Sequence, residues 1–144
     1  MAQTWTLLIV EDNPDDIELT LLAFEQTGLR ENVVIARDGV EAINYLFADN
    51  PVLNSLPALI LLDLQLPRIN GLEVLRLIRS HARTQLLPIV ILTTSHEESD
   101  RLQGYSLGCN SYIRKPVDFD QFVNVIQQLG MYWLVLNSPP PLTQ

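Results

Sequence analysis

The sequence predicts an α/β protein: a single domain with a doubly wound, five-stranded parallel sheet built from five consecutive strand–helix units. Short apolar runs alternate along the chain with stretches of helical periodicity, the pattern of a parallel sheet with crossover helices. Acids, hydroxyls and a lysine follow these runs, as expected where strands deliver functional groups to one edge of a sheet. A length of 144 residues, 47% of them hydrophobic and 18% charged, suits one globular domain.

The first unit has the clearest local signals. Residues 7–10 form an apolar strand, and Asn13 and Pro14 suit the N-cap and the first position of a following helix. Asp15 and Asp16 would then lie near the positive end of the helix dipole. The apolar face of this helix is predicted to comprise Ile17, Leu21 and Phe24. Gly28 is predicted to end the helix.

The next two units are shorter. A strand at 33–36 precedes a short helix, and a loop over 49–57, marked by prolines, leads to a third strand at 59–62. The segment from Asn70 to Glu73 resembles a capping box that opens the third helix. The apolar residues assigned to these two helices are Val40, Ile43, Tyr45, Leu46, Leu72, Leu75 and Ile78.

The last two units follow the same plan. After a strand at 89–92, the segment from Ser95 to Glu98 repeats the capping-box pattern, and the fourth helix is expected to stop at Gly108. After a strand at 112–113, Asp118 is expected to cap a fifth helix that continues to residue 136. Its apolar stripe comprises Phe122, Ile126, Leu129, Trp133 and Leu136. The domain is therefore predicted to span residues 1–136, with a Pro-rich C-terminal tail at 137–144.

Composition argues against several classes of function. A net charge of −8 disfavours nucleic-acid binding, which depends on neutralising phosphates with Lys and Arg. No apolar run approaches the length of about 20 residues that a membrane span needs. The N-terminus lacks the pattern of a signal peptide, and the single cysteine, Cys109, excludes an internal disulfide. The expected compartment is a reducing cytoplasm.

Four strand ends converge on one predicted pocket. Glu11 and Asp12 follow the first strand, Asp63 the third, Thr93 the fourth and Lys115 the fifth. Because the carboxyl ends of parallel strands meet at one edge, these groups should form a small acidic pocket that faces one ammonium. Such a pocket suits a divalent cation and a phosphoryl group.

Each of these residues also has a plainer structural interpretation. Glu11 and Asp12 could act as helix-capping acids, Asp63 as an exposed acid at a strand end, and Lys115 as a surface lysine. Thr93 could be an ordinary β-branched strand residue, and Tyr112 a half-buried strand aromatic. The functional interpretation is favoured because the strand-end residues are all predicted to lie at the same edge of the sheet.

The same residues carry a resemblance to a known family. Glu11-Asp12, the segment from Asp63 to Pro67 followed by Gly71, Thr93, and Lys115-Pro116 are similar to the pattern of response-regulator receiver domains, over residues 5 to about 129. Thr93 lies 30 residues after Asp63, and Lys115 lies 52 after it, as is usual in that family. Residues 109–122 and the Trp- and Pro-containing tail resemble the stand-alone regulators paired with cyanobacterial and bacterial phytochromes.

This resemblance implies a flavodoxin-like fold and a two-component signalling function. Asp63 would accept a phosphoryl group from the phosphohistidine of a sensor histidine kinase, such as a phytochrome, in a Mg²⁺-dependent reaction. Asp12 and Asp63 would bind Mg²⁺ directly, with the backbone carbonyl of Gln65 as a third ligand and Glu11 acting through a water molecule. The protein would have no attached effector domain, and would catalyse only its own phosphorylation and dephosphorylation.

The resemblance also implies how the phosphoryl group is read. Lys115 would pair with Asp63 at rest and with a phosphoryl oxygen afterwards, and a cis bond to Pro116 would direct it inward. The hydroxyl of Thr93 would move to the phosphoryl group, and Tyr112 would change its burial with that movement. The result would be a changed affinity for a partner or for a second copy of the chain.

Other classes of function remain as alternatives. A Mg²⁺-dependent aspartyl-phosphate phosphatase of the haloacid dehalogenase type would carry a second acid where this chain has Gln65. A flavin-binding module would need a phosphate-cradling loop, where Glu11 and Asp12 would repel phosphate. A phosphorelay intermediate and a degenerate receiver that only docks partners complete the set.

The C-terminal segment predicts a homodimer. Apolar residues surround the fifth helix and continue beyond the length that packing on the sheet requires. A second copy could cover them through a two-fold interface, whereas the alternative is that they fold back onto their own domain. The residues assigned to this interface are Phe119, Tyr132, Trp133 and Leu134.

Overall fold

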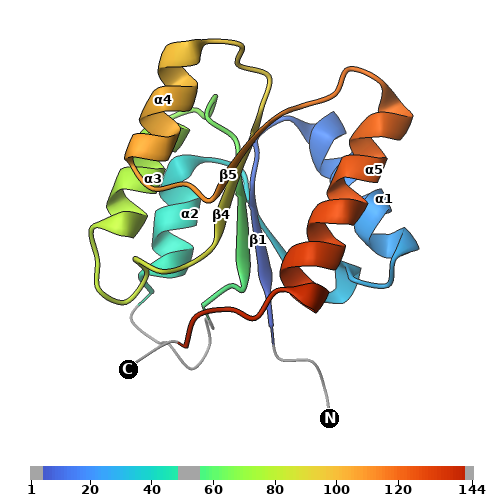
Figure 1. The fold of residues 1–144 in the computed structure, drawn as a ribbon, viewed down its shortest axis with the longest axis horizontal. Helices are drawn as coiled ribbons and strands as arrows, with labels where there is room; N and C mark the ends of the chain where they lie inside the picture. Colours follow the sequence, from blue (N-terminus) through green and yellow to red (C-terminus); the bar gives the residue numbers. More distant parts are fainter. Residues whose placement is uncertain (1–4, 49–55, 142–144) are drawn as a thin grey trace.

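The computed structural model describes residues 5–48 and 56–141. Five parallel strands form one sheet in the order β2-β1-β3-β4-β5. The strands are β1 (Leu7–Val10), β2 (Val33–Ala36), β3 (Leu59–Leu62), β4 (Ile89–Thr93) and β5 (Ser111–Arg114). The helices are α1 (Pro14–Gln26), α2 (Gly39–Leu46), α3 (Gly71–Arg79), α4 (Glu98–Ser106) and α5 (Phe119–Gly130). Helices α2, α3 and α4 cover one face of the sheet, and α1 and α5 cover the other (Figure 1), which confirms the predicted doubly wound fold.

Alternation along the strands builds a core on each face of the sheet. In β1, Leu8 and Val10 belong to the cluster that includes α2 and α3, whereas Leu7 and Ile9 belong to the cluster that includes α1 and α5. Because successive side chains of a strand point to opposite faces, a strand buried on both faces must be apolar throughout. This explains why the apolar runs of the sequence are continuous.

The winding direction of the sheet reverses at β1. Val10 pairs with Ala36 of β2 on one side and with Leu62 of β3 on the other. The residues that follow these paired positions, Glu11 and Asp63, therefore leave the sheet side by side. In open α/β sheets the crevice at such a switch point is where ligands bind.

The predicted first helix is confirmed, with one difference in its buried face. The side chain of Asn13 caps it by accepting hydrogen bonds from the backbone N–H groups of Asp15 (2.9 Å) and Asp16 (3.2 Å). Gly28, with a φ of 76°, follows its C-terminus. Leu21 is only half-buried, because Thr20 and Ala23 share the inner face with Ile17 and Phe24.

The predicted caps of the later helices are only partly right. At α3 the side chain of Asn70 accepts from the N–H of Glu73 (3.0 Å), but the carboxylate of Glu73 pairs with Arg76 instead of reaching back. Asp118 occupies the N-cap position of α5 without a side-chain capping bond.

The capping box predicted at Ser95 is wrong. Helix α4 begins at Glu98, and its N-cap residue, Glu97, makes no side-chain capping bond. Ser95 is buried before the helix, where its hydroxyl accepts from the N–H of Glu97 (3.3 Å) and donates to Asp100 (2.6 Å). The serine thus holds the loop between β4 and α4.

The regular part of the fifth helix is shorter than predicted. Helix α5 ends at Gly130, and the chain continues as the π-helical segment η2 (Met131–Leu136). A Cβ at Gly130 would meet Phe24 at 2.8 Å and Leu29 at 3.0 Å, so the helix approaches these side chains closely. The wider turn then shifts the phase of the apolar stripe, which leaves Leu136 exposed.

Parts of the prediction fall outside the described residues. The proline-marked loop over 49–57 is described only at its last two positions, and the tail only to residue 141. The division at residues 136 and 137 stays a prediction. Among the described helices, none is both long and apolar enough to cross a membrane.

Candidate functional site

The predicted polar residues meet at the carboxyl edge of the sheet. Glu11 and Asp12 follow β1, Asp63 follows β3 and Lys115 follows β5. Together they line a hollow of about 570 Å³. Its lining comprises Glu11, Asp12, Asn13, Pro14, Asp15, Asp16, Asp63, Gln65, Thr94 and Lys115.

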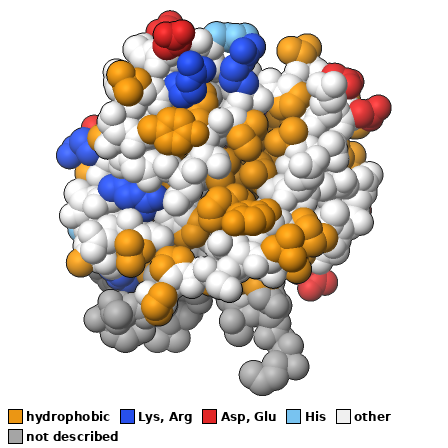
Figure 2. Space-filling view, in the orientation of Figure 1, with side chains coloured by type: hydrophobic (Ala, Val, Ile, Leu, Met, Phe, Trp, Pro, Cys, Tyr) orange, Lys and Arg blue, Asp and Glu red, His pale blue; other side chains and the backbone are white. Residues whose placement is uncertain are grey.

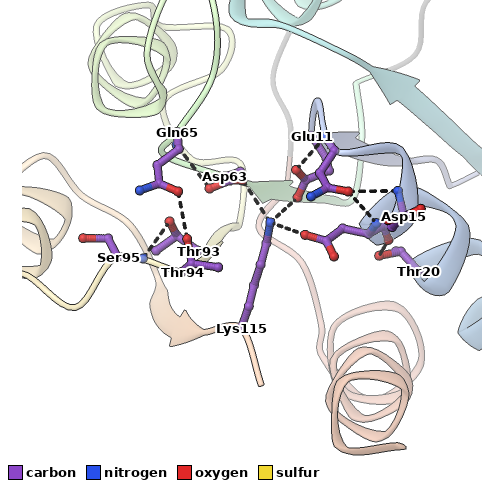
Figure 3. Close-up of polar contacts among 11 residues, drawn as sticks. Glu11, Asp15, Thr20, Asp63, Gln65, Thr93, Thr94, Ser95 and Lys115 are labelled. Carbon is purple, nitrogen blue, oxygen red and sulfur yellow. Dashed lines mark hydrogen bonds and ion pairs between the residues drawn. The ribbon is translucent and has the colours of Figure 1, made fainter. Parts of the chain in front are cut away.

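The ammonium of Lys115 is the hub of this site (Figure 3). Its Nζ lies 2.7 Å from Oε1 of Glu11, 2.7 Å from Oδ2 of Asp16 and 3.0 Å from Oδ2 of Asp63. Only 5% of the lysine side chain is exposed. One buried cation therefore holds three carboxylates together.

Backbone groups fix the other oxygens of the two buried acids. Oε2 of Glu11 accepts a hydrogen bond from the N–H of Asn13 (3.1 Å), and Oδ1 of Asp63 accepts from the N–H of Gln65 (3.1 Å). The turn after β3 is kept tight by Gly71, where a Cβ would collide with the backbone carbonyl of Asp63. These contacts orient both carboxylates toward the hollow.

The crowding of acids has a clear electrostatic signature. Burial, together with the neighbouring Asp63 carboxylate, raises the pKa of Glu11 from its ordinary value of 4.5 to about 7, although Lys115 opposes this shift. Burial alone would lower the pKa of Lys115, but the carboxylates of Asp16, Glu11 and Asp63 outweigh burial and raise it. The site therefore carries excess negative potential around a firmly charged lysine.

Three of the acids have the geometry of a metal site. Carboxylate oxygens of Glu11, Asp12 and Asp63 lie within 4.8 Å of one another, with Asp12 exposed and the other two buried. Oxygen ligands of this kind suit Mg²⁺ or Mn²⁺, and a dication would relieve the repulsion between them. The acidic cluster thus fits a divalent cation. The backbone carbonyl of Gln65 stays a predicted ligand.

Two hydroxyls at the end of β4, those of Thr93 and Thr94, have different surroundings. Thr93 is fully buried, and its Oγ1 accepts a hydrogen bond from the N–H of Ser95 (3.3 Å). Thr94 lines the hollow instead, and its hydroxyl donates to Oε1 of Gln65 (2.8 Å). The sequence analysis missed Thr94, although side-chain alternation after a strand indicates that adjacent hydroxyls face different sides.

Tyr112 lies in β5, close to the loop that carries Ser95. Its ring is half-buried, and burial raises the pKa of its phenol. The hydroxyl is buried near Ser95, but no hydrogen bond with satisfactory geometry reaches it from the described residues. A buried hydroxyl without a hydrogen-bond partner destabilises the folded state. A change of position that gave the Tyr112 hydroxyl a partner would therefore be favourable.

The implied cis bond at Lys115–Pro116 is not found, because no described peptide bond is cis. The backbone positions Lys115 in another way. The N–H of Lys115 donates to the carbonyl of Thr93 (2.8 Å), which extends the pairing of β5 with β4 by one residue.

Asp16 is the charged residue that the sequence analysis placed only near a helix dipole. It lies in the first turn of α1, and its side chain joins the contacts of Lys115. The sequence did contain a sign of this contact, because the helix begins only two residues after Asp12. Such a short connection keeps the first turn of the helix, and with it Asp16, beside the end of β1.

The residues predicted for an interface differ in how exposed they are. Phe119 and Tyr132 are exposed, whereas Trp133 and Leu134 are half-buried against the chain's own core. Figure 2 shows hydrophobic side chains gathered across the face that carries α4, β5 and α5. The elements of this α4–β5–α5 face carry exposed apolar side chains, with Leu102 and Tyr105 on α4 and Phe119 on α5. Exposed Tyr132 lines a groove together with Ile113, Val125 and Trp133.

Comparison with known proteins places these features in one family. Residues 7–127 match the model of the response regulator receiver domain. The chain is 38% identical over 134 residues to a probable methanogenesis regulatory protein, FilR2, of Methanothrix harundinacea, with 93% of this chain and 86% of that protein covered. It is 35% identical over 129 residues to the response regulator Rcp1 of a Synechocystis strain, with 89% and 88% covered.

Solved structures agree with the sequence comparison. The phosphorylated cyanobacterial phytochrome response regulator RcpA superposes with a TM-score of 0.89 at 36% identity, covering 96% of this chain and all of that one. The Mn²⁺-bound form of a response regulator Rcp1 gives a TM-score of 0.87 at 33% identity, with the same coverage. On its sheet order, its acidic pocket and these matches, the chain belongs to the family of response regulator receiver domains.

Proposed function

We propose that this chain is a phosphoacceptor of a two-component system and that Asp63 receives the phosphoryl group from a kinase phosphohistidine. The observation that carries this proposal is the contact between Lys115 and Asp63 inside a pocket that also presents Glu11 and Asp12. A carboxylate that must react with a phosphoryl group needs positive charge beside it, because both reactants are anionic.

The transfer exchanges one bond to phosphorus for another. An oxygen of Asp63 attacks the phosphorus, the P–N bond to the kinase imidazole breaks, and an acyl phosphate forms on Asp63. The electron pair of the broken bond stays on the imidazole nitrogen. Asp63 enters the reaction already oriented by the N–H of Gln65 and by Lys115.

A divalent cation fits the proposed roles of the acids. Asp12 and Asp63 would hold Mg²⁺ directly, with the Gln65 carbonyl as a further ligand and Glu11 acting through water. When bound, the cation neutralises charge on the carboxylates and on the phosphoryl oxygens.

Reading of the phosphoryl group is assigned to three residues. Lys115 transfers its contact from Asp63 to a phosphoryl oxygen. Thr93 gives up its bond with the N–H of Ser95 and turns its hydroxyl toward the pocket, which moves the loop before α4. Tyr112 then follows into the space that the loop vacates.

The proposed phosphoryl donor is a sensor histidine kinase, such as a phytochrome. The likeness to RcpA, a cyanobacterial phytochrome response regulator, supports this assignment. A reducing cytoplasm suits the buried free thiol of Cys109.

The proposed response is a change in self-association. Helix α4, which follows the loop that carries Ser95, and helix α5 both bear exposed apolar side chains. A two-fold interface would bring the α4–β5–α5 face against its own copy. Phe119 and Tyr132 would contribute directly, and Trp133 and Leu134 through the part of each side chain that stays exposed.

Turnover of external substrates is not part of this proposal. A phosphatase that used Asp63 as its nucleophile would place a general acid two residues later, and Gln65 cannot supply a proton in that way. Its amide is also occupied, because its carbonyl accepts from Thr94. We therefore assign to the chain only its own phosphorylation and dephosphorylation.

The test is incubation with a small acyl phosphate and Mg²⁺, followed by intact-mass measurement. Wild type should gain one phosphoryl group, which Asp63→Asn should not. Asp120→Asn, which removes an exposed acid of α5, is the control and should behave as wild type. Undiminished incorporation by Asp63→Asn would overturn the assignment, and continuous release of phosphate from an aryl phosphate by wild type would favour the phosphatase.

A further inference from the structure

The three carboxylates that hold Lys115 are not equivalent. Glu11 and Asp63 belong to the cluster that could bind a metal ion, and Asp16 does not. Yet Oδ2 of Asp16 lies as close to Nζ, at 2.7 Å, as the nearest oxygen of Glu11. Asp16 therefore contacts the lysine but lies outside the acidic cluster found among the described residues.

The backbone of Asp16 is fixed from two sides. Its N–H donates to the side chain of Asn13 (3.2 Å), and its carbonyl accepts from the buried hydroxyl of Thr20 (2.7 Å). The first turn of α1 thus presents this carboxylate at a set position, with 21% of the side chain exposed. The hydrogen bond from Lys115 to Asp16 also helps to raise the pKa of Lys115 against the effect of burial.

Lys115 and a divalent cation draw on the same carboxylates, because Lys115 contacts Glu11 and Asp63 and both belong to the acidic cluster. A cation that takes Asp63 as a ligand, with Glu11 acting through water, weakens the attraction of both acids for the ammonium. A buried charge that loses its partners is strongly destabilised. Asp16 offers the ammonium a contact that the cation does not claim.

We propose that Asp16 is a positioning residue for Lys115: it retains the ammonium when a cation binds Asp12 and Asp63, with Glu11 acting through water, and keeps it within reach of the phosphoryl group. This rests on the proposed function, in which the pocket binds Mg²⁺ and Asp63 is phosphorylated. Without Asp16, Lys115 would stay on Glu11 and Asp63 and would oppose the cation. The lysine would then act as a competitor for the site.

The affinity for Mg²⁺, measured by calorimetric titration, tests this role separately from phosphorylation. Asp16→Asn should weaken Mg²⁺ binding by about tenfold, within the range of coupling between contacting charges. Asp15→Asn is the matched control: it removes an equal charge from the same helical turn, but Asp15 has no contact with Lys115 among the described interactions. Asp15→Asn should weaken binding by less than about twofold, since exposed charges interact weakly through water.

A double-mutant cycle decides whether Asp16 acts through the lysine. In a Lys115→Met background, Asp16→Asn should lose its excess effect and should match Asp15→Asn. An excess that persists there would mean that Asp16 acts on the cation itself, and equal effects of the two asparagine variants in the wild-type background would mean that only net charge matters. Either result would overturn the proposal.

Failure of the proposed function would look different. Wild type would then show no Mg²⁺ binding at all, whereas failure of the Asp16 proposal leaves wild-type binding and phosphorylation intact. Circular dichroism establishes that each variant is folded. If Asp16→Asn does not fold, Asp16→Ser, a smaller neutral residue that suits a helix first turn, enters the same cycle with the same expected outcomes.

Discussion

The hydroxyl of Thr94 donates a 2.8 Å hydrogen bond to the side-chain carbonyl of Gln65, and both residues line the pocket on one side of Asp63 (Figure 3). The contact joins the loop after β4 to the loop after β3. It holds the Gln65 side chain at the rim of the hollow, where we expect it to hinder the approach of water to a phosphoryl group on Asp63.

Thr94→Val keeps the shape of the threonine and removes the donor. Gln65 should then move freely, and hydrolysis of the acyl phosphate should accelerate by about two- to tenfold, since a hydrogen bond of this kind contributes about 0.5–1.5 kcal/mol. The decay of phosphorylated protein, followed by intact mass after removal of the donor, measures this. Thr27→Val, at the far end of α1, is the control, and equal decay of both variants and wild type would refute the role of the contact.

Mg²⁺ should stabilise the protein, because a ligand that binds only the folded state shifts unfolding by mass action. At a concentration 100 times its dissociation constant the gain is about 2.7 kcal/mol. Asp12→Asn should lose most of this gain and should melt at a higher temperature than wild type in EDTA, since repulsion is relieved. Identical melts of wild type in EDTA and in millimolar Mg²⁺ would remove the basis for the metal site.

Glu11 should make the stability of the metal-free protein depend on pH. Its pKa is raised to about 7 in the folded state, so the folded protein holds that proton more tightly than the unfolded chain does. The stabilisation is fully present below pH 4.5 and is lost as the pH rises through about 7. Glu11→Gln cannot ionise and should lack this loss.

Denaturant titrations in EDTA at several pH values measure the effect. Relative to Glu11→Gln, wild type should lose about 1–3 kcal/mol of unfolding free energy across that interval, in keeping with about 1.4 kcal/mol per pKa unit. A constant difference between the two proteins from pH 4.5 to 8 would contradict the raised pKa of Glu11.

Thr93→Ala should separate phosphorylation from its consequence. Asp63, the acids and Lys115 remain, so the acyl phosphate should still form. The phosphorylation-dependent change in self-association should be lost, because no hydroxyl can leave Ser95 for the phosphoryl group. Sedimentation of the protein with and without phosphorylation gives the measurement, and a wild-type response by Thr93→Ala would exclude the proposed switch.

Tyr132→Asp should yield a folded monomer that still accepts phosphate. Tyr132 is 51% exposed, so the change places a charge in the proposed interface without emptying the core. Leu86→Asp, at an exposed leucine in the loop before β4, is the control and should remain dimeric. If wild-type protein sediments as a monomer at every concentration, phosphorylated or not, the dimer itself is excluded.

The five parallel strands and the convergence of Glu11, Asp63 and Lys115 could be predicted from sequence, because buried parallel strands require continuous apolar runs. A polar residue at the end of such a run has only one edge of the sheet to occupy. The outcome at Ser95 could not be predicted. A serine three residues before an acid fits a capping box, but burial of Ser95 beside Asp100 outweighed that local preference.

The contacts of Asp16 and Trp133 also could not be predicted from the sequence. The contact of Asp16 with Lys115 joins the two ends of the domain, and no local pattern contains it. Trp133 was expected on a regular helix, but the turn widens after Gly130, where the helix meets Phe24. Both outcomes depend on tertiary packing, which sequence periodicity does not specify.

The position of Lys115 along the chain also determines when the pocket can form during synthesis. Lys115 follows β5, the last strand to leave the ribosome, and it lies 99 residues after Asp16 and 52 after Asp63. A nascent chain that ends before β5 carries the acids of the pocket without the cation that holds them together. We therefore expect the pocket to reach its full geometry only after β5, the last strand along the chain, has joined the sheet.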